Sequence, residues 1–492
     1  MREPAAGGAK NSSPDWRPTR ADVPDLADWP AWRLLAAYEN GDLTPAEALD
    51  AVLAAARSRG RALGAFTSVF DEDARAAVAR LPGPSAARPG SAGLQGVPLS
   101  VKDDLFTAGL RTSGGSRAFA EHVPSGEGPA VARARGAGAV VFAKTNLSEL
   151  SMLLEPGSPL YGLCRNPWRA DRIAGASSCG AAAAIAAGIG PLALATDTGG
   201  SIRYPAALCG VFGFAPSGGR VPRYGNFGVN HMLCAIGPMA RSTRDASLLL
   251  SAISGADPSD PATWPWPQPL KPLTTQRQTR VAHLRVAWAE RPDLPSDARV
   301  LQRVEQTAQA LCRDLGWPFT AAPFAPDADA EGQAAFGVLS DCDRLGLMQA
   351  AGHLDDARLA AMSSAVQARL ARARAHSGSA YALALETRRL FMARVWPLFR
   401  QVDLLMSCTL GHVAPPPARS QAVGSDAMSR LWWSNFAGAP AATLPVGFVD
   451  GLPVGLHVAA RPGADGRLLS ACAELERALA PGWGGFSCAP RA

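Results

Sequence analysis

Two serines in one glycine-rich segment have the residue types and surroundings that covalent catalysis needs. Residues 175–206 read GASSCGAAAAIAAGIGPLALATDTGGSIRYPA, with Gly, Ser and Ala where a buried segment usually carries larger apolar residues. Ser201 follows Gly199 and Gly200, which suits a nucleophile on a tight turn with free backbone N–H groups beside it. Ser177 stands at the other end of an alanine-rich run. A serine is a weak nucleophile, so this chemistry requires a base.

Lys102 is the base that the sequence favours. None of the seven histidines (122, 231, 283, 353, 376, 412 and 457) lies in or next to the segment, although catalytic triads also assemble from distant positions. Lys102 follows an alternating apolar run, Val97, Leu99 and Val101, which predicts a strand entering a core. Burial lowers the pKa of a lysine, and the neutral amine is a general base. A strand-end lysine that reaches solvent is the ordinary alternative.

The sequence around Ser201 resembles the motif of the amidase signature family. That motif closes on Asp-x-Gly-x-Ser-aliphatic-Arg-x-Pro, and residues 197–205 read DTGGSIRYP here. The distance along the chain between Ser177 and Ser201 also equals that between the two functional serines of family members. The resemblance runs from about residue 32 to residue 480. It implies an α/β fold with a central mixed β-sheet covered by helices on both faces.

The resemblance also implies a role for each residue of the motif. Ser201 would be the nucleophile, Ser177 a relay that in the family follows a cis peptide bond, and Lys102 the base. A helix N-cap is the alternative role for Ser177. The backbone N–H groups of the oxyanion hole would belong to Thr198, Gly199, Gly200 and Ser201. The supporting side chains would be Ser178, Asp197 and Arg203. No cofactor and no metal is implied, and the cysteines and histidines show no metal-ligand spacing.

The chain departs from the family pattern without losing any of these groups. The departures are Ala176, Cys179, Ala181 and Ala215. Of these, Cys179 stands where glycine or serine is usual, so it bears on the shape of the turn and the substrate range. A small buried cysteine is the favoured interpretation over a reactive thiol.

Composition excludes several classes of protein. A hydrophobic content of 47% with 18% charged residues is typical of a globular protein, and no apolar run reaches the roughly 20 residues of a membrane span. The net charge of +6 is small, and the arginines are scattered. Nine cysteines without a CxxC pair and an N-terminus without an apolar core predict a cytoplasmic protein. We expect a small-molecule amide as partner, no nucleic acid and no membrane, and a homodimer stays open.

The chain is predicted to form one amidase signature domain after a short tail. Residues 1–25 are rich in Pro, Gly, Ser and Arg and are predicted to be disordered, and residues 26–485 form the domain. Helices within about 327–430 are expected to be variable and to face the substrate. Local signals predict a helix after Thr44 and Pro45, a helix capped by Thr243, and a strand over residues 281–288.

Three functions are open from the sequence. The first is an amidohydrolase that cleaves a carboxamide C–N bond through an acyl-enzyme on Ser201. The second is the glutaminase-type subunit of a tRNA-dependent amidotransferase. Against it, Met428 stands seven positions before Asn435, where that subunit's aspartate is expected. The third, a catalytically idle binding protein, is disfavoured because every catalytic position is present.

Overall fold

The structure is a computed structural model that describes residues 25–81, 93–228, 232–273 and 281–479. The predicted N-terminal tail, residues 1–25, lies outside these segments except for Asp25.

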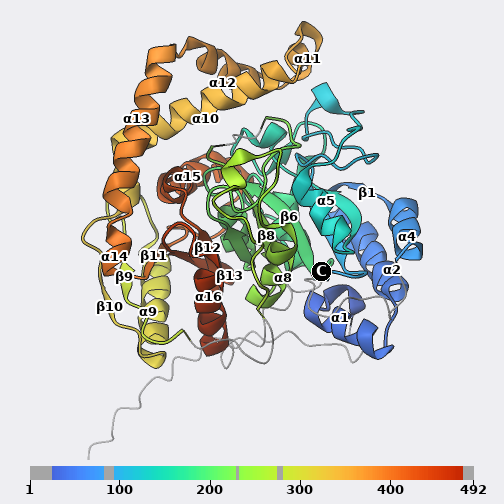
Figure 1. Cartoon of the computed structure of the whole chain (residues 1–492), viewed down its shortest axis with the longest axis horizontal. Coiled ribbons are helices and arrows are strands. Elements are labelled where there is room, and N and C mark those ends of the chain that lie inside the picture. Colours follow the sequence, from blue (N-terminus) through green and yellow to red (C-terminus); the bar gives the residue numbers. More distant parts are fainter. Residues whose placement is uncertain (1–24, 82–92, 229–231, 274–280, 480–492) are drawn as a thin grey trace, which may run out of the picture.

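A large mixed sheet runs through the molecule (Figure 1). Its 11 strands have the order β1-β3-β2-β6-β8-β7-β12-β13-β11-β9-β10, and β4 pairs with β5 in a separate ribbon. Strand β2 is parallel to β3 and β6, whereas β6 is antiparallel to β8. The strands are β1 Phe66–Val69, β2 Pro98–Lys102, β3 Val140–Thr145, β4 Gly157–Ser158, β5 Gly162–Leu163, β6 Leu192–Asp197, β7 Phe212–Ala215, β8 Ala235–Ala240, β9 Val286–Trp288, β10 Phe319–Ala321, β11 Leu404–Cys408, β12 Ala441–Val449 and β13 Leu452–Ala459.

Helices cover both faces of this sheet. They are α1 Ala31–Asn40, α2 Pro45–Ala55, α3 Arg61–Leu63, α4 Asp71–Ala79, α5 Pro129–Gly136, α6 Cys179–Ala186, α7 Arg203–Cys209, α8 Thr243–Ile253, α9 Ala298–Asp314, α10 Ala330–Ala350, α11 Asp356–Ala361, α12 Ser364–Ala375, α13 Gly378–Val395, α14 Leu398–Gln401, α15 Ser420–Ala437 and α16 Asp465–Leu479. One core contains residues of α5, α8, α9 and α16, and another contains residues of α2 and α6. The predicted α/β class with a mixed, doubly covered sheet is confirmed.

Strand β6 shows how the sequence builds these two cores. Successive strand side chains point to opposite faces. Leu192 and Leu194 join the core with α8, while Ala193 and Ala195 join the alanines of α6. Because alanine side chains are small, α6 packs close to the sheet and holds the segment that precedes it against the end of β6.

Of the three elements predicted from local sequence signals, one is confirmed as predicted and two differ in their bounds or cap. Thr44 caps α2 in a capping box with Glu47, as predicted. Helix α8, however, is capped by Ser242, whose side chain accepts from the Asp245 N–H, and Thr243 is its first residue. The predicted strand over 281–288 is confined to β9, since His283 has a positive φ of 57°, which extended backbone does not adopt.

Residues 327–400 are mostly helical, as expected, and include α10 to α13, which run across the top of the view in Figure 1 from α13 on the left to α11 on the right. Helix α10 packs against α12, α13 and α15. Within the described segments, no helix is long and apolar enough to span a membrane.

Candidate active site

Lys102 ends strand β2 and is fully buried between β3 and β6. Its Nζ lies 2.7 Å from Ser177 Oγ and 2.7 Å from Thr196 Oγ1. Asp104 Oδ2 lies 3.4 Å from the same nitrogen. Burial lowers the pKa of Lys102 below its ordinary value, and the nearby Asp104 carboxylate opposes this shift only in part. The structure therefore brings the predicted base to the predicted relay serine and favours its neutral form.

Ser177 and Ser178 form the turn that enters α6. The peptide bond between Ala176 and Ser177 is cis, as in the family that the sequence resembles. Ser178 occupies the N-cap position of α6, but its hydroxyl donates to the Thr196 carbonyl (3.2 Å) and not to the helix. Both serines are buried, and Ser177 is 2% exposed. Neither hydroxyl caps α6, so the alternative role of Ser177 as an N-cap is not seen.

Ser201 lies on the loop that joins β6 to α7, beside the serine turn. Its carbonyl accepts a hydrogen bond from the Ser178 N–H (3.3 Å), which fixes the loop against the residue next to Ser177. Ser201 is partly exposed, whereas its neighbours are buried. Gly200 has φ of 119°, a conformation that favours glycine. The proposed nucleophile is thus the accessible hydroxyl of a closely packed loop.

Asp197 and Arg203 hold both ends of this loop. Their fully buried side chains form a bidentate pair, with Nε to Oδ2 at 3.0 Å and Nη2 to Oδ1 at 2.9 Å. Asp197 also accepts from the N–H groups of Gly200 (2.7 Å) and Ile202 (3.0 Å). Burial alone would raise the pKa of Asp197, but Arg203 and these N–H groups outweigh it and lower the pKa to about 2.

The hydrogen bond from Gly200 bears on one sequence prediction. The Gly200 N–H donates to the buried Asp197 carboxylate at 2.7 Å, so an oxyanion would share this donor with Asp197. The role of the Thr198, Gly199, Gly200 and Ser201 N–H groups as an oxyanion hole stays a prediction.

Several residues of the site were missed from the sequence. Thr196 Oγ1 bridges Lys102 and Asp104, donating to Asp104 Oδ2 at 2.7 Å. Asp104 was within reach of prediction, because it stands two positions after Lys102 on the same strand end. Around Arg203, three residues of distant elements complete the network: Ser434 (2.6 Å), Asn435 (2.5 Å) and His457 (3.1 Å). No pattern in the sequence around Arg203 predicts these three partners.

The other ionisable candidates lie away from the serines. In the described segments, no hydrogen bond joins a histidine to Ser177 or Ser201, and His231 lies outside those segments. Buried Lys144 bonds the Leu105 carbonyl and the hydroxyls of Thr107 and Thr112, and burial lowers its pKa to about 8. These partners belong to the 105–112 loop and fit the structural role expected for Lys144. The described residues include no group of three or more metal-ligating side chains.

Met428, Phe336 and Leu431 cover the glycines before Ser201. A Cβ placed on Gly199 would lie 2.8 Å from Met428 Sδ and 3.0 Å from the Phe336 ring, and one on Gly200 would lie 2.7 Å from Leu431 Cδ1. Gly200 also has a positive φ, so glycine is strongly favoured there, whereas a larger residue at Gly199 requires the Met428 side chain to shift. The wall above the candidate oxyanion loop is therefore apolar, and it comes from α10 and α15.

This fold and site agree with the family comparison. The chain matches the Amidase family model over residues 47–469, and it belongs to that family. It is therefore an enzyme of the amidase class, which includes hydrolases and amidotransferase subunits.

The proteins that this chain is similar to include amidotransferase subunits and an aryl acylamidase. The chain is 34% identical to a glutamyl-tRNA(Gln) amidotransferase subunit of Thermus thermophilus, over 92% of this chain and 97% of that protein. The structure of the corresponding glutamyl-tRNA(Gln) amidotransferase subunit from Thermotoga maritima superposes with a TM-score of 0.74 at 25% identity, covering 92% of this chain and 95% of that one. A bacterial aryl acylamidase of the amidase signature family superposes with a TM-score of 0.81 at 24% identity, covering 93% and 97%, and shows the shared fold.

Proposed function

We propose that this protein is an amidohydrolase that cleaves a linear carboxamide by a Ser-Ser-Lys mechanism, with an acyl-enzyme on Ser201. The observation that carries the proposal is the buried contact of 2.7 Å between Lys102 Nζ and Ser177 Oγ. A lysine with a lowered pKa in contact with a serine is the arrangement of a base and its proton donor.

The hydrogen bonds around Lys102 support a direction for the proton. The Thr196 hydroxyl gives its single proton to the Asp104 carboxylate, so toward Lys102 it acts as an acceptor. One N–H of the neutral amine then points to Thr196, and the lone pair is left for the Ser177 hydroxyl. Thr196 and Asp104 are positioning residues in this scheme, because they act through Lys102.

The reaction follows from these contacts. Ser201 Oγ attacks the amide carbon while its proton passes to Ser177 Oγ, and the Ser177 proton passes to Lys102 Nζ. The backbone N–H groups of residues 198–201 stabilise the oxyanion. The intermediate collapses as the proton returns through Ser177 to the leaving nitrogen, which departs as ammonia or an amine. Water then attacks the acyl-enzyme by the same relay and releases a carboxylic acid.

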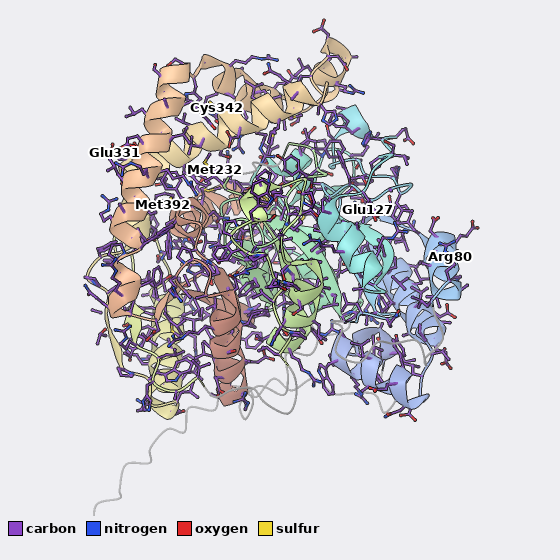
Figure 2. All side chains as sticks on the ribbon, viewed as in Figure 1. Arg80, Glu127, Met232, Glu331, Cys342 and Met392 are labelled. Carbon is purple, nitrogen blue, oxygen red and sulfur yellow. The ribbon has the colours of Figure 1, made fainter. Side chains whose placement is uncertain are left out.

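The apolar wall of Met428, Phe336 and Leu431 supports an acyl group that is apolar near the reacting carbon. A cavity of about 420 Å³ lies along α10 and is lined by Met232, Cys342 and Tyr381, among others. Figure 2 labels Met232 and Cys342. We expect the helices within 327–430 to face the substrate.

The second candidate is a glutaminase-type subunit that works in a complex with partner proteins. It is favoured by the identity with the Thermus thermophilus amidotransferase subunit over nearly the whole chain. Against it stands the thioether of Met428, since glutamine carries an ammonium and a carboxylate that an apolar wall leaves unpaired. A cytoplasmic location is also proposed, supported by the eight described cysteines, which are all free.

Turnover of a panel of amides by purified protein tests this function. The panel contains aryl amides, aliphatic amides, matched esters and glutamine, with Ser201→Ala as the matched variant. We expect turnover of an apolar amide, a loss of about 10⁴-fold or more in Ser201→Ala, and labelling of Ser201 by a fluorophosphonate. Fluorophosphonate labelling that persists in Ser201→Ala would place the nucleophile elsewhere. Hydrolysis of glutamine alone would favour the glutaminase-type role.

A further inference from the structure

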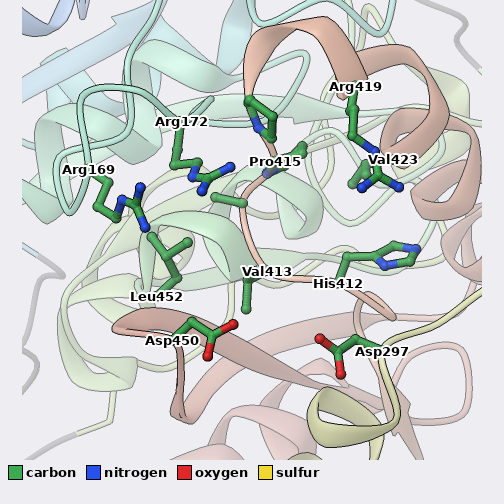
Figure 3. A pocket seen from close by; sticks show the side chains of 12 residues that line it. Arg169, Arg172, Asp297, His412, Val413, Pro415, Arg419, Val423, Asp450 and Leu452 are labelled. Atoms are coloured by element: carbon green, nitrogen blue, oxygen red, sulfur yellow. The ribbon is translucent and has the colours of Figure 1, made fainter.

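A cavity of about 400 Å³ lies between the 169–172 loop, the 412–416 segment and the start of α15 (Figure 3). The guanidinium groups of Arg169, Arg172 and Arg419 occupy one side of it, and the carboxylates of Asp297 and Asp450 occupy the other. Its volume is within the range of small-molecule sites.

The two carboxylates share one guanidinium from outside the cavity. Arg299 binds Asp297 Oδ2 at 2.7 Å and Asp450 Oδ1 at 2.9 Å. Arg299 does not line the cavity, so it binds the Asp297 and Asp450 carboxylates from outside the cavity. One positive charge offsets only one of the two negative charges, so one negative charge remains to face the three arginines.

Two of those arginines lack a full partner. Asp171 binds Arg169 at 2.8 Å and lies 3.6 Å from Arg172 Nε, which is too long for a hydrogen bond. Within the described residues, the buried Nε of Arg172 has no hydrogen-bond partner. The guanidinium of Arg419 makes no ion pair with any described residue. With Asp171 paired to Arg169 and one carboxylate charge left on the facing side, the three arginines still leave an excess of one positive charge in the cavity.

The floor of the cavity is apolar. Val413, Val423 and Leu452 line it, and they pack in a cluster that also contains Ala176, the residue before Ser177. None of the residues that line the cavity belongs to the candidate active site. The combination of arginines and an apolar floor is that of a site for an amphiphilic anion.

We propose that this cavity binds a small organic carboxylate with a compact apolar body. The carboxylate pairs with Arg172 and Arg419, and the apolar body rests on Val413, Val423 and Leu452. The planar guanidinium suits a carboxylate because it donates two parallel hydrogen bonds. This inference does not depend on the proposed hydrolysis.

Calorimetric titration with benzoate tests the proposal. Benzyl alcohol has the same ring without the charge, and inorganic phosphate has the charge without the ring. We expect one benzoate per chain, with benzyl alcohol and phosphate each bound at least about 10-fold more weakly. Phosphate binding as tight as that of benzoate would overturn the role of the apolar floor.

Substitutions of the arginines that line the cavity test whether benzoate binds there. The double variant Arg172→Gln/Arg419→Gln should weaken benzoate binding by about 10-fold or more, since hydrogen bonds between charged groups are lost. Arg374→Gln, which removes an exposed arginine of α12 outside the cavity, is the matched control and should change nothing. Should the double variant fail to fold, exposed Arg419→Gln alone carries the test. Unchanged affinity in these variants, or no saturable binding to the wild type, would overturn the proposal.

Discussion

The hydroxyl of Thr196 lies 2.7 Å from Lys102 Nζ, and it stands between that nitrogen and the Asp104 carboxylate, to which it donates at 2.7 Å. Asp104 itself is 3.4 Å from Lys102. The threonine therefore keeps the amine oriented toward Ser177 and takes up one of the hydrogen bonds that the carboxylate accepts. A change at Thr196 should affect the base without removing any reacting group.

We expect Thr196→Val to lower kcat/KM by about 10- to 100-fold, from the loss of one buried hydrogen bond and of the amine's orientation. The acid limb of the pH profile should move to higher pH, because Asp104 then acts on Lys102 without the intervening hydroxyl and favours the ammonium form. Thr196→Ser retains the hydroxyl and should restore both values. A Thr196→Val enzyme with the wild-type pH limb would show that Thr196 has only a packing role.

The protonation state of the base should determine how kcat/KM depends on pH. If neutral Lys102 accepts the proton, kcat/KM rises with pH through the pKa of this lysine, which burial sets below its ordinary value. Lys102→Ala should remove this limb. Lys102→Arg should not rescue activity, since a guanidinium stays protonated and cannot accept a proton. Near-wild-type rates in Lys102→Arg, or loss of the limb on substitution of a histidine such as His412, would favour a Ser-His arrangement.

The sequence marks those parts of the candidate site that local patterns encode, and their catalytic roles stay predictions. Lys102, Ser177 and Ser201 stand at strand ends and tight turns, where residue type and spacing carry information. Thr196 was missed because a threonine in a strand is ordinary, and only the three-dimensional placement of Lys102 gives it a role. The partners of Arg203 come from α15 and β13, more than 200 positions away in the chain, and a single sequence does not report such pairings.

A single sequence also does not report how a loop folds back on itself, which explains one open prediction and one correction. Gly200 was assigned to the oxyanion hole because glycines before a nucleophile usually expose their N–H groups. In the structure, Asp197 folds back on the loop and takes that N–H. The choice between Ser242 and Thr243 as the cap of α8 rests on backbone angles at one residue, since both types are good caps.

Asp197→Asn should destabilise the fold strongly, by about 3–5 kcal/mol, because it leaves the buried guanidinium of Arg203 without its counter-charge. Urea denaturation at neutral pH measures this. The pKa of Asp197 in the folded protein, about 2, is lower than in an unfolded chain. Its contribution is thus present above about pH 4 and is lost as the pH falls toward 2.

A matched control for Asp197→Asn is Asp171→Asn, which breaks an exposed pair with Arg169. Surface pairs contribute little, so its urea midpoint should stay close to that of the wild type. Equal midpoints for the two variants would mean that the pair between Asp197 and Arg203 does not hold the loop before Ser201.

Met428 offers a test of the acyl specificity, because its sulfur lies against Gly199 of the candidate oxyanion loop and its side chain is partly exposed. Met428→Asp should lower kcat/KM for an apolar amide by about 100-fold. A carboxylate at this position repels the negative charge that develops on the substrate oxygen, and the repulsion is strong where water is excluded.

The control variant Met428→Leu preserves the volume and the apolar surface, so its kcat/KM should stay within about 3-fold of the wild type. Because the repulsion acts on the transition state, the loss in Met428→Asp should appear mainly in kcat. If Met428→Asp and Met428→Leu react alike, the negative charge of the transition state does not develop beside residue 428. If Met428→Asp instead gains glutamine hydrolysis while losing the apolar amide, this single position separates the two proposed activities of the fold.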